Sequence, residues 1–303
     1  MDRIIDVATD GRHLSRERGF LIVSDEAGEV GRVPLDEIAA LIVHAHGITW
    51  TQSLLAVLGD RGVPVVLCGP DHAPRSVLMP LEGHHAQGGR LRDQWTAGRP
   101  LMKQAWKRLV KAKITFQAAV LDAVGEASAP LTMLSRKVTS GDEGNREAQA
   151  ARYYWPRLMG TDFRRDQAGE GPNMLLNYGY TILRATAARS VVAAGLHPSI
   201  GVHHSNRGNA FALADDLMEP FRPLVDCAVR NIHASLGERV EPEAKRRLVA
   251  LMGLDLRVGD VNSPVSVALA RLALSLGRSF ESGTVQLLLP DPPPPLTLSG
   301  LGK

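Results

Sequence analysis

The spacing of apolar residues changes near residue 85, and this change limits the possible fold more than any other feature of the chain. Before that point the apolar residues form short runs at 20–23, 38–43 and 63–68, with Gly, Pro and Asp between them. Short apolar runs bounded by turn-forming residues are typical of strands. Residues 51–62 differ, and we expect one helix there that ends at Gly62. Residues 1–84 are therefore predicted to form a small β-rich domain.

Residues 85–286 have another pattern, because apolar side chains recur at helical spacing from Pro100 onward, in long segments rich in Ala and Leu. We expect a larger, nearly all-α domain here, which makes the whole chain an α+β protein. Residues 80–99 are rich in Gly, His and Gln and are interpreted as a linker. The helices are expected at 100–124, 130–138, 145–159, 172–194, 210–235, 242–252 and 264–275.

The last segment, residues 287–303, contains consecutive prolines at 292–295. Proline has no amide hydrogen to donate and its ring fixes φ, so this run cannot continue a helix. We therefore expect an extended or disordered tail that follows the two domains.

The composition excludes several classes of protein. Cys68 and Cys227 are the only cysteines and lie far apart, which argues against a disulfide framework or a zinc site. No apolar run approaches the roughly 18 residues that a membrane-spanning helix needs. An apolar fraction of 44% and a charged fraction of 22% are ordinary for a globular protein. We therefore expect a cytoplasmic protein with no membrane partner.

Positive charge is concentrated in the middle third of the chain. Residues 90–190 contain 17 Lys and Arg against 9 Asp and Glu, whereas residues 1–89 contain 7 against 12. Basic residues from Lys103 to Lys113 recur at spacings of three and four, with Trp106 among them. A helix with this pattern can contact several phosphates along a duplex, although basic helices are also common as solvated faces. The middle third is the predicted nucleic-acid surface.

Two adjacent blocks, 201–206 and 215–223, place histidines and carboxylates within a short stretch of sequence. Asp216 and Glu219 are three residues apart, so on a helix they project from the same face. Mg²⁺ and Mn²⁺ prefer oxygen ligands, and Mn²⁺ also accepts imidazole. The segment therefore predicts half of a metal site, with Glu147 as the best candidate for a further carboxylate.

Each of these residues also has a plain structural explanation. A glutamate such as Glu147, near the start of a predicted helix, stabilises the positive end of the helix dipole. A histidine such as His204 is as often a packed or surface residue as a ligand. The spacing of Asp216 and Glu219 is also typical of two acidic residues on the solvated face of a helix. Singly, none of them decides the function.

Together and in this order, the blocks resemble the CRISPR-associated adaptation endonuclease/integrase family, the larger of the two proteins that insert new spacers into a CRISPR array. The resemblance rests on Glu147 within REAQAARYYW, His204 within GVHHSNRGN, and the block LADDLMEPFRP with Asp226 downstream. It extends from about residue 10 to about residue 285 and includes the basic 103–113 stretch. The GVHHSN form looks most like the branch found beside single-protein RNA-guided effector nucleases (type II systems).

The resemblance implies that Glu147, His204 and Glu219 are the catalytic residues and bind Mg²⁺ or Mn²⁺. His204 is preferred to His203 because of its spacing to the acidic block, and Asp216 is a second-choice ligand or a ligand of a second metal. Tyr178, Asn206 and Arg222 are expected near the site, where they would orient a ligand or contact phosphate. For Tyr178 a buried tyrosine in a helical core is the competing explanation. The residues expected to contact DNA are Lys103, Lys107, Arg108, Lys111, Arg164, Arg165 and Arg207.

The activity that the resemblance implies is attack of a 3′-hydroxyl of incoming DNA on a phosphodiester of the array, with nuclease activity when water is the nucleophile. It also implies a homodimer formed through residues 1–84, double-stranded protospacer and repeat DNA, and a small ferredoxin-like partner protein in a heterohexamer. Two alternatives remain: a non-catalytic DNA-binding scaffold of the adaptation complex, and a helical metallohydrolase of small molecules. The basic middle third argues against the latter.

Overall fold

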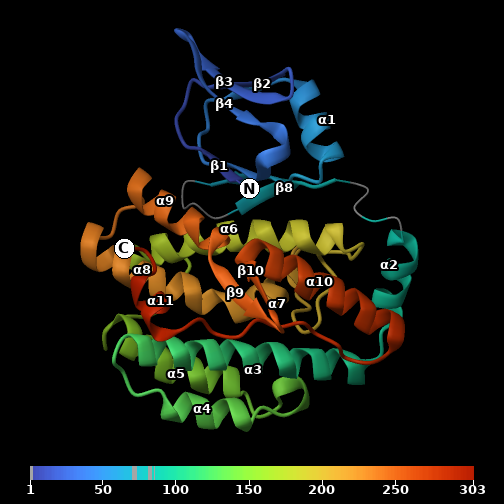
Figure 1. Ribbon diagram of the computed structural model, residues 1–303, viewed down its shortest axis with the longest axis vertical. Coiled ribbons are helices and arrows are strands. Elements are labelled where there is room, and N and C mark those ends of the chain that lie inside the picture. Colours follow the sequence, from blue (N-terminus) through green and yellow to red (C-terminus); the bar gives the residue numbers. More distant parts are fainter. Residues whose placement is uncertain (1–2, 70–73, 81–83, 85) are drawn as a thin grey trace.

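The computed structural model describes residues 3–69, 74–80, 84 and 86–303. It shows a small β-rich end above a larger helical body, so the expected α+β class is confirmed (Figure 1). Residue 85, at which the boundary was expected, lies outside the described residues.

The β-rich end contains two four-stranded sheets, with strand orders β4-β3-β2-β6 and β1-β5-β7-β8. In the second sheet β1 and β7 each pair with β5 in parallel, and β8 pairs with β7 antiparallel. Helix α1 begins after Thr51, whose hydroxyl oxygen accepts a hydrogen bond from the amide of Leu54, as an N-cap residue does. The elements are β1 (Arg3–Val7), β2 (His13–Glu17), β3 (Phe20–Asp25), β4 (Gly28–Pro34), β5 (Ile38–Val43), β6 (Thr49–Trp50), α1 (Gln52–Asp60), β7 (Val65–Cys68) and β8 (Pro74–Leu78).

Strand β5 is buried on both faces and separates two hydrophobic cores. Leu41 and Val43 pack with Leu14 and Leu54 inside the β-rich end. Ala40 and Ile42 alternate with them and join the core of the helical body. A strand covered on both sides is a continuous apolar run, which explains why residues 38–43 have no polar position.

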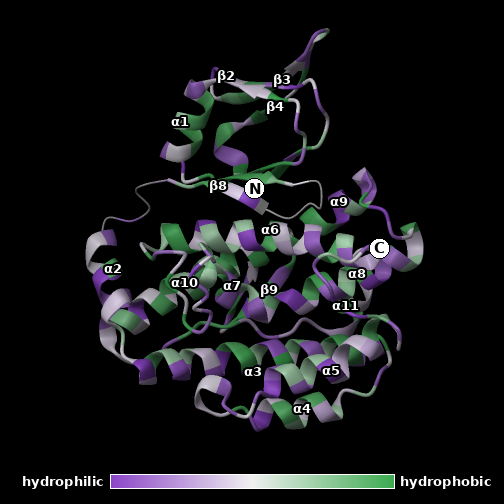
Figure 2. Cartoon of the chain, turned by 180° about the vertical axis from the view of Figure 1, so that it is seen from behind, coloured by the Kyte–Doolittle hydropathy of each residue, from purple (hydrophilic) through white to green (hydrophobic). Residues whose placement is uncertain are grey.

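The helical body surrounds α6, which packs against α7, α8, α9, α10 and the strand β5. Figure 2 shows apolar residues along the inward sides of these helices. α6 and α8 approach closely, since a Cβ on Gly179 would lie 2.5 Å from Cγ1 of Val225. The helices are α2 (Gln87–Thr96), α3 (Arg99–Ala123), α4 (Ala129–Arg136), α5 (Arg146–Met159), α6 (Pro172–Ala193), α7 (Ala212–Met218), α8 (Arg222–Leu236), α9 (Pro242–Ala250), α10 (Val265–Ser282) and α11 (Pro295–Gly300). No helix in the described part of the chain is both long and apolar enough to cross a membrane.

The segment expected to be a linker contains a helix, α2, which tertiary contacts fix in place. The buried side chain of Gln94 donates from Nε2 to the carbonyls of His197 and Ile200 and accepts from the amide of His197. Arg90 forms an ion pair with Glu281 on α10. The local composition is poor in helix formers, so these partners on distant segments could not be predicted from it.

Two further expectations need correction in the helical domain. The predicted helix at 210–235 is interrupted: α7 ends at Met218, a 3₁₀ turn spans Glu219–Phe221, and α8 begins at Arg222. Pro220 and Pro223 each lack an amide donor, which favours the start of a new helix at these points. Residues 255–264 form a hairpin of β9 (Asp255–Val258) and β10 (Val261–Pro264), so the domain is less purely helical than expected.

The tail also differs from its prediction, because residues 287–303 pack on the helical body. Leu298 and Leu301 are buried, and the prolines lead directly into α11, which contacts α3 and α8. Sγ of Cys227 lies 3.2 Å from the carbonyl oxygen of Leu298, and Nδ2 of Asn231 donates to the carbonyl of Leu301 at 2.7 Å. Proline at the first turn of a helix costs no hydrogen bond, so this run starts a helix although it could not continue one.

Candidate active site

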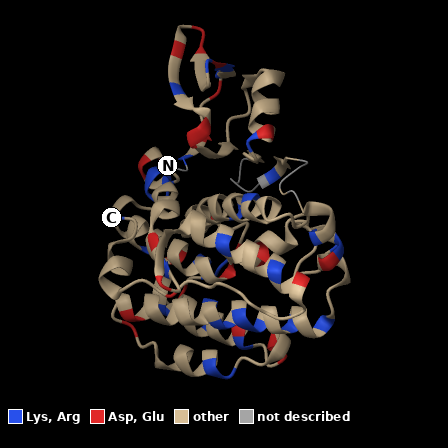
Figure 3. Ribbon diagram, turned by 45° about the vertical axis from the view of Figure 1, so that its right-hand side comes forward, with Lys and Arg blue, Asp and Glu red and all other residues tan. Residues whose placement is uncertain are grey.

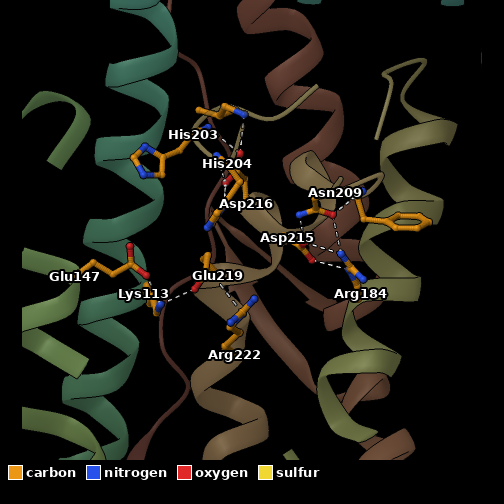
Figure 4. A network of polar contacts seen from close by, with 12 residues as sticks. Lys113, Glu147, Arg184, His203, His204, Asn209, Asp215, Asp216, Glu219 and Arg222 are labelled. Carbon is orange, nitrogen blue, oxygen red and sulfur yellow. Dashed lines mark hydrogen bonds and ion pairs between the residues drawn. The ribbon is translucent and has the colours of Figure 1, made fainter. Parts of the chain in front are cut away.

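The predicted ligands come together where α3, α5, α7 and the segment before α7 meet (Figure 4). Asp216 organises this region from α7, and its side chain is fully buried. Its Oδ2 accepts hydrogen bonds from the amides of Val202, at 2.6 Å, and His203, at 2.9 Å. Gly201 allows this approach, since a Cβ there would lie 2.4 Å from the carbonyl oxygen of His204. The loop is therefore wrapped around one carboxylate.

His204 is oriented by the same carboxylate. Its Nδ1 lies 2.5 Å from Oδ1 of Asp216, and this hydrogen bond raises the pKa of the imidazole despite its partial burial. Such a contact leaves Nε2 as the ring nitrogen that can serve as a ligand, and carboxylate-bound histidines commonly bind metals in this way. Asp216 therefore acts as the positioning residue for His204 in this arrangement.

His203 has a different environment although it is the next residue. Its ring stacks on the indole of Trp106, with centroids 4.2 Å apart and planes 2° from parallel. Trp106 itself is buried under this contact. The geometry thus separates the two histidines and favours His204 as the candidate ligand.

Glu147 and Glu219 converge on a single cationic atom, Nζ of Lys113 (Figure 4). Nζ lies 2.5 Å from Oε1 of Glu147 and 2.6 Å from Oε2 of Glu219. Burial alone would raise the pKa of Glu219, but the positive charges of Arg222 and Lys113 outweigh it and lower that pKa. The side chains of both glutamates therefore face the same ammonium.

The donor set suits a hard divalent cation. Two carboxylates already surround one positive charge, and Oε2 of Glu219 is buried with no hydrogen-bond donor among the described residues. Carboxylate oxygens with one imidazole match the preferences of Mg²⁺ and Mn²⁺. As the side chains lie, however, the described residues contain no group of three His, Cys, Asp or Glu that could hold an ion. Lys113 stands between the two glutamates instead.

A buried polar cluster lies behind Glu219. Nε of Arg222 is 3.3 Å from Oε1 of Glu219, and its guanidinium lies over the ring of Tyr180. The Tyr180 hydroxyl is 2.5 Å from Oδ1 of Asp226, whose pKa burial raises to about 7. Of the two roles considered for Arg222, the structure places it beside a candidate ligand, Glu219.

Asp215 turns away from Asp216 and makes a bidentate ion pair. Nε and Nη2 of Arg184 lie 2.6 Å and 2.7 Å from its two oxygens, and Nη2 also contacts Oδ1 of Asn209. The adjacent carboxylates of this motif therefore have separate functions. Asp216 holds the histidine loop, whereas Asp215 ties α7 and the preceding turn at Asn209 to α6.

Two other sequence candidates lie outside this cluster. The Tyr178 hydroxyl is 3.0 Å from Oδ2 of Asp6, on β1, so this tyrosine connects the two domains and belongs to a different set of contacts. Oδ1 of Asn206 accepts from the amide of Gly208 and forms a local turn. The structure thus does not place Tyr178 beside the predicted ligands.

The basic candidates divide into exposed and internally bonded residues. Arg108, Lys111 and Arg207 are exposed, and Lys107 is half-buried. Lys103 is exposed but pairs with Glu143 at 2.8 Å. Among the loop arginines, exposed Arg164 donates to the carbonyls of Thr161 and Phe163, whereas half-buried Arg165 donates to the side-chain oxygens of Asn173 and Asn177. Figure 3 shows how Lys and Arg are distributed over the helical body.

Sequence reasoning missed Lys113 and Arg184 as parts of the site. Lys113 was counted with the phosphate-contacting residues, yet it points inward. One signal existed, because Trp106, Val110 and Lys113 share one helical face, which the structure buries. A lysine within an apolar stripe requires buried carboxylate partners.

The fold and the candidate site define an α+β protein in which two glutamates of the helical body converge on one lysine, beside a histidine held by an aspartate. Residues 5–236 match the family model described as CRISPR associated protein Cas1. A CRISPR-associated endonuclease Cas1 from Neisseria meningitidis is 33% identical over 291 residues, which cover 93% of this chain and 94% of that protein. Another, from Pyrobaculum aerophilum, is 30% identical, with 91% and 98% covered. The chain belongs to the Cas1 family.

Solved structures share the fold at low sequence identity. A casposase bound to integration product superimposes with a TM-score of 0.79 at 20% identity, covering 94% of this chain and 92% of that one. A CAS1 protein from Thermotoga maritima gives 0.73 at 17% identity, with 94% and 98% covered. A Cas6-RT-Cas1–Cas2 complex gives 0.74 at 19% identity, with 95% of this chain and 36% of the other covered.

Proposed function

We propose that this protein is a metal-dependent DNA endonuclease and integrase of CRISPR adaptation, which inserts spacer DNA by attack of a 3′-hydroxyl on a phosphodiester. The observation that carries the proposal is the convergence of Glu147 and Glu219 on one cation-binding point close to the carboxylate-held His204. The relatives named CRISPR-associated endonucleases support the nuclease chemistry.

Glu147, His204 and Glu219 would hold Mg²⁺ or Mn²⁺, which supplies charge neutralisation at a phosphate and activation of an oxygen nucleophile when bound. Asp216 keeps Nδ1 of His204 engaged, so the ring presents its other nitrogen. Arg222 holds the charge of Glu219 in place from behind. These contacts preorganise the site before any DNA arrives.

We propose that DNA lies along the exposed basic side chains of α3. Arg108 and Lys111 are exposed on this helix, and Trp106 and Lys113 on its inward face border the candidate site. Lysine and arginine on phosphates position DNA without reading its sequence. Affinity should therefore fall steeply with salt.

We also propose a homodimer formed through residues 1–84 and a complex with a small ferredoxin-like partner, which corresponds to a Cas2 protein. Support comes from the structural similarity to Cas1–Cas2 complexes and to a casposase bound to integration product. In such an assembly the β-rich end would be the contact between two copies.

The second candidate is a non-catalytic DNA-binding scaffold. The ion pairs of Lys113 with Glu147 and Glu219 favour it, because they already neutralise carboxylates that would otherwise require a metal. This alternative predicts DNA binding without strand joining or nicking at any metal concentration.

The deciding experiment incubates the protein with a branched half-site DNA and Mn²⁺ or Mg²⁺. Wild type is compared with Glu147→Ala, His204→Ala and Glu219→Ala, and with Glu126→Ala, an exposed glutamate away from the site, as a control. Metal-dependent joining that is lost in the first three variants and retained in the control supports the proposal. A wild-type protein that binds the DNA but never joins it, with and without the partner protein, supports the scaffold.

A further inference from the structure

Lys113 occupies the position at which the two candidate ligand carboxylates point. It lies on the inward face of α3, two helical turns after Trp106. The side chains of Lys113 and Glu219 are 12% and 3% exposed, so the ion pair is almost removed from water. Figure 4 shows the lysine between Glu147, from α5, and Glu219, from the turn between α7 and α8.

The lysine compensates for a strong repulsion. Two carboxylate oxygens lie within 2.6 Å of one nitrogen, so without a cation they would face each other in a poorly solvated site. The side-chain nitrogen of Lys113, placed against both oxygens, offsets this repulsion.

The contact with Glu219 is incomplete as a hydrogen bond. Nζ of Lys113 donates to Oε1 of Glu147, whereas its short contact with Oε2 of Glu219 lacks hydrogen-bond geometry, and that oxygen has no donor among the described residues. Carboxylate oxygens are also the ligands that Mg²⁺ prefers. The contact of the ammonium with Glu219 is thus an ion pair that another cation could form in its place.

The local charge indicates how a metal would fit. Glu147 and Glu219 are balanced by Lys113 and Arg222, so the formal charges of these four side chains sum to zero without a metal. A divalent cation added beside both basic groups would leave an excess of positive charge in a buried place, which is costly. That excess is smaller if the ammonium of Lys113 moves away from the carboxylates. The flexible four-carbon side chain of Lys113 allows the ammonium to move while α3 stays in place.

We propose that Lys113 is a displaceable counter-cation of the metal site. Its ammonium holds Glu147 and Glu219 together in the metal-free protein and leaves their midpoint when Mn²⁺ or Mg²⁺ binds. The inference rests on the proposed function, because it requires these glutamates to be metal ligands. Lys113 then stabilises the metal-free fold and, by the same contacts, weakens the affinity for metal.

The first test measures Mn²⁺ binding by calorimetry, and thermal unfolding without metal, for wild type, Lys113→Met and Lys137→Met. Lys137 is exposed at the end of α4 and provides a matched control. We expect Lys113→Met to bind Mn²⁺ at least tenfold more tightly and to unfold at a lower temperature without metal, while Lys137→Met matches wild type. Equal or weaker Mn²⁺ binding by Lys113→Met, with normal binding by wild type, overturns the inference and leaves the proposed function intact.

The remaining outcomes are also decisive. Binding of Mn²⁺ by Lys113→Met but not by wild type supports displacement strongly, and so does a variant that folds only when Mn²⁺ is added. Binding by neither protein overturns both the inference and the metal-dependent function.

A second test uses only wild-type protein, so it does not depend on whether a variant folds. Wild-type protein is acylated with a lysine reagent at increasing Mn²⁺ concentration, and labelling of Lys113 and Lys137 is measured by mass spectrometry. We expect labelling of Lys113 to rise at least threefold at saturating Mn²⁺, while that of Lys137 stays constant. Unchanged or reduced labelling of Lys113 at saturating Mn²⁺ overturns the inference.

Discussion

The imidazole of His203 lies flat against the indole of Trp106, at a centroid distance of 4.2 Å. The adjacent His204 instead contacts Asp216 through Nδ1. Two neighbouring histidines in one loop thus have separate functions, one in packing against α3 and one at the candidate metal site. The order of residues in the sequence could not separate them. Trp106 contacts both rings, face to face with His203 and edge-on with His204, and the hydrogen bond to Asp216 distinguishes His204.

His204→Ala should reduce metal-dependent strand joining by about 100-fold or more, because it removes a ligand nitrogen. His203→Ala should keep most of the joining activity and lower the melting temperature, since it removes only the stacking contact. Initial rates on branched DNA, with melting curves of both variants, test this. The opposite ranking of rates would make His203 the ligand.

Asp216→Asn should weaken Mn²⁺ binding by about 10- to 100-fold, the range found when a residue that orients a metal-binding histidine is changed. It should also cost about 1–3 kcal/mol of stability, because buried amides lose a charged acceptor. Asp215→Asn is the matched control: it breaks the Arg184 pair and should lower stability without changing Mn²⁺ affinity. Equal Mn²⁺ affinities of all three proteins would contradict the positioning role of Asp216.

Local patterns were sufficient for most of the secondary structure. The runs at 20–23 and 38–43 became β3 and β5, and the helix at 51–62 became α1. Two of the errors occurred where distant partners decide the structure: α2 depends on a buried Gln94 that bonds to residues about one hundred positions away, and α11 depends on α8. Composition cannot reveal such partners.

For the site, the order of blocks along the chain singled out Glu147, His204 and Glu219, and the structure brings the two glutamates to one point. The sequence could not show that Lys113 stands between them, because spacing alone assigned this lysine to the basic surface. For Tyr178 the sequence left two explanations open, because on α6 a tyrosine can face either the helices or the sheet. The structure places its hydroxyl against Asp6, 172 residues earlier.

Leu298→Ala should destabilise the protein by about 2–5 kcal/mol, as large-to-small changes in a core do. Leu298 is fully buried on α11, while Leu296, two residues earlier, is 85% exposed. Leu296→Ala is therefore the control and should change stability by less than about 0.5 kcal/mol. Urea unfolding of both variants provides the measurement, and equal stabilities would mean that α11 does not pack on the helical body in solution.

Asp226 should make stability depend on pH. Burial raises its pKa from 3.8 to about 7, so the folded protein retains a proton that the unfolded chain has released between these values. The unfolding free energy of wild type should therefore fall as pH rises from about 4 to about 7 through this group. Asp226→Asn keeps an acceptor for the Tyr180 hydroxyl but does not titrate. We expect the unfolding free energy of Asp226→Asn minus that of wild type, measured with urea, to increase from pH 4.5 to pH 8. A difference that stays constant over this range would refute the raised pKa of Asp226.

Tyr178→Phe should lower stability without impairing catalysis. The Tyr178 hydroxyl lies 3.0 Å from Oδ2 of Asp6, and Nζ of Lys245 lies 3.1 Å from the same oxygen, so the cluster joins β1 to α6 and α9. Loss of one hydroxyl from this half-buried carboxylate should cost about 1.5–3 kcal/mol, because hydrogen bonds to charged groups are the stronger ones. Tyr153→Phe, which removes an exposed hydroxyl bound to the carbonyl of Ala127, is the control and should cost less.

Strand-joining rates of both variants should stay within about twofold of wild type, since neither hydroxyl lies among the candidate ligands. A large loss of joining by Tyr178→Phe at unchanged stability would instead return this tyrosine to the reacting phosphate.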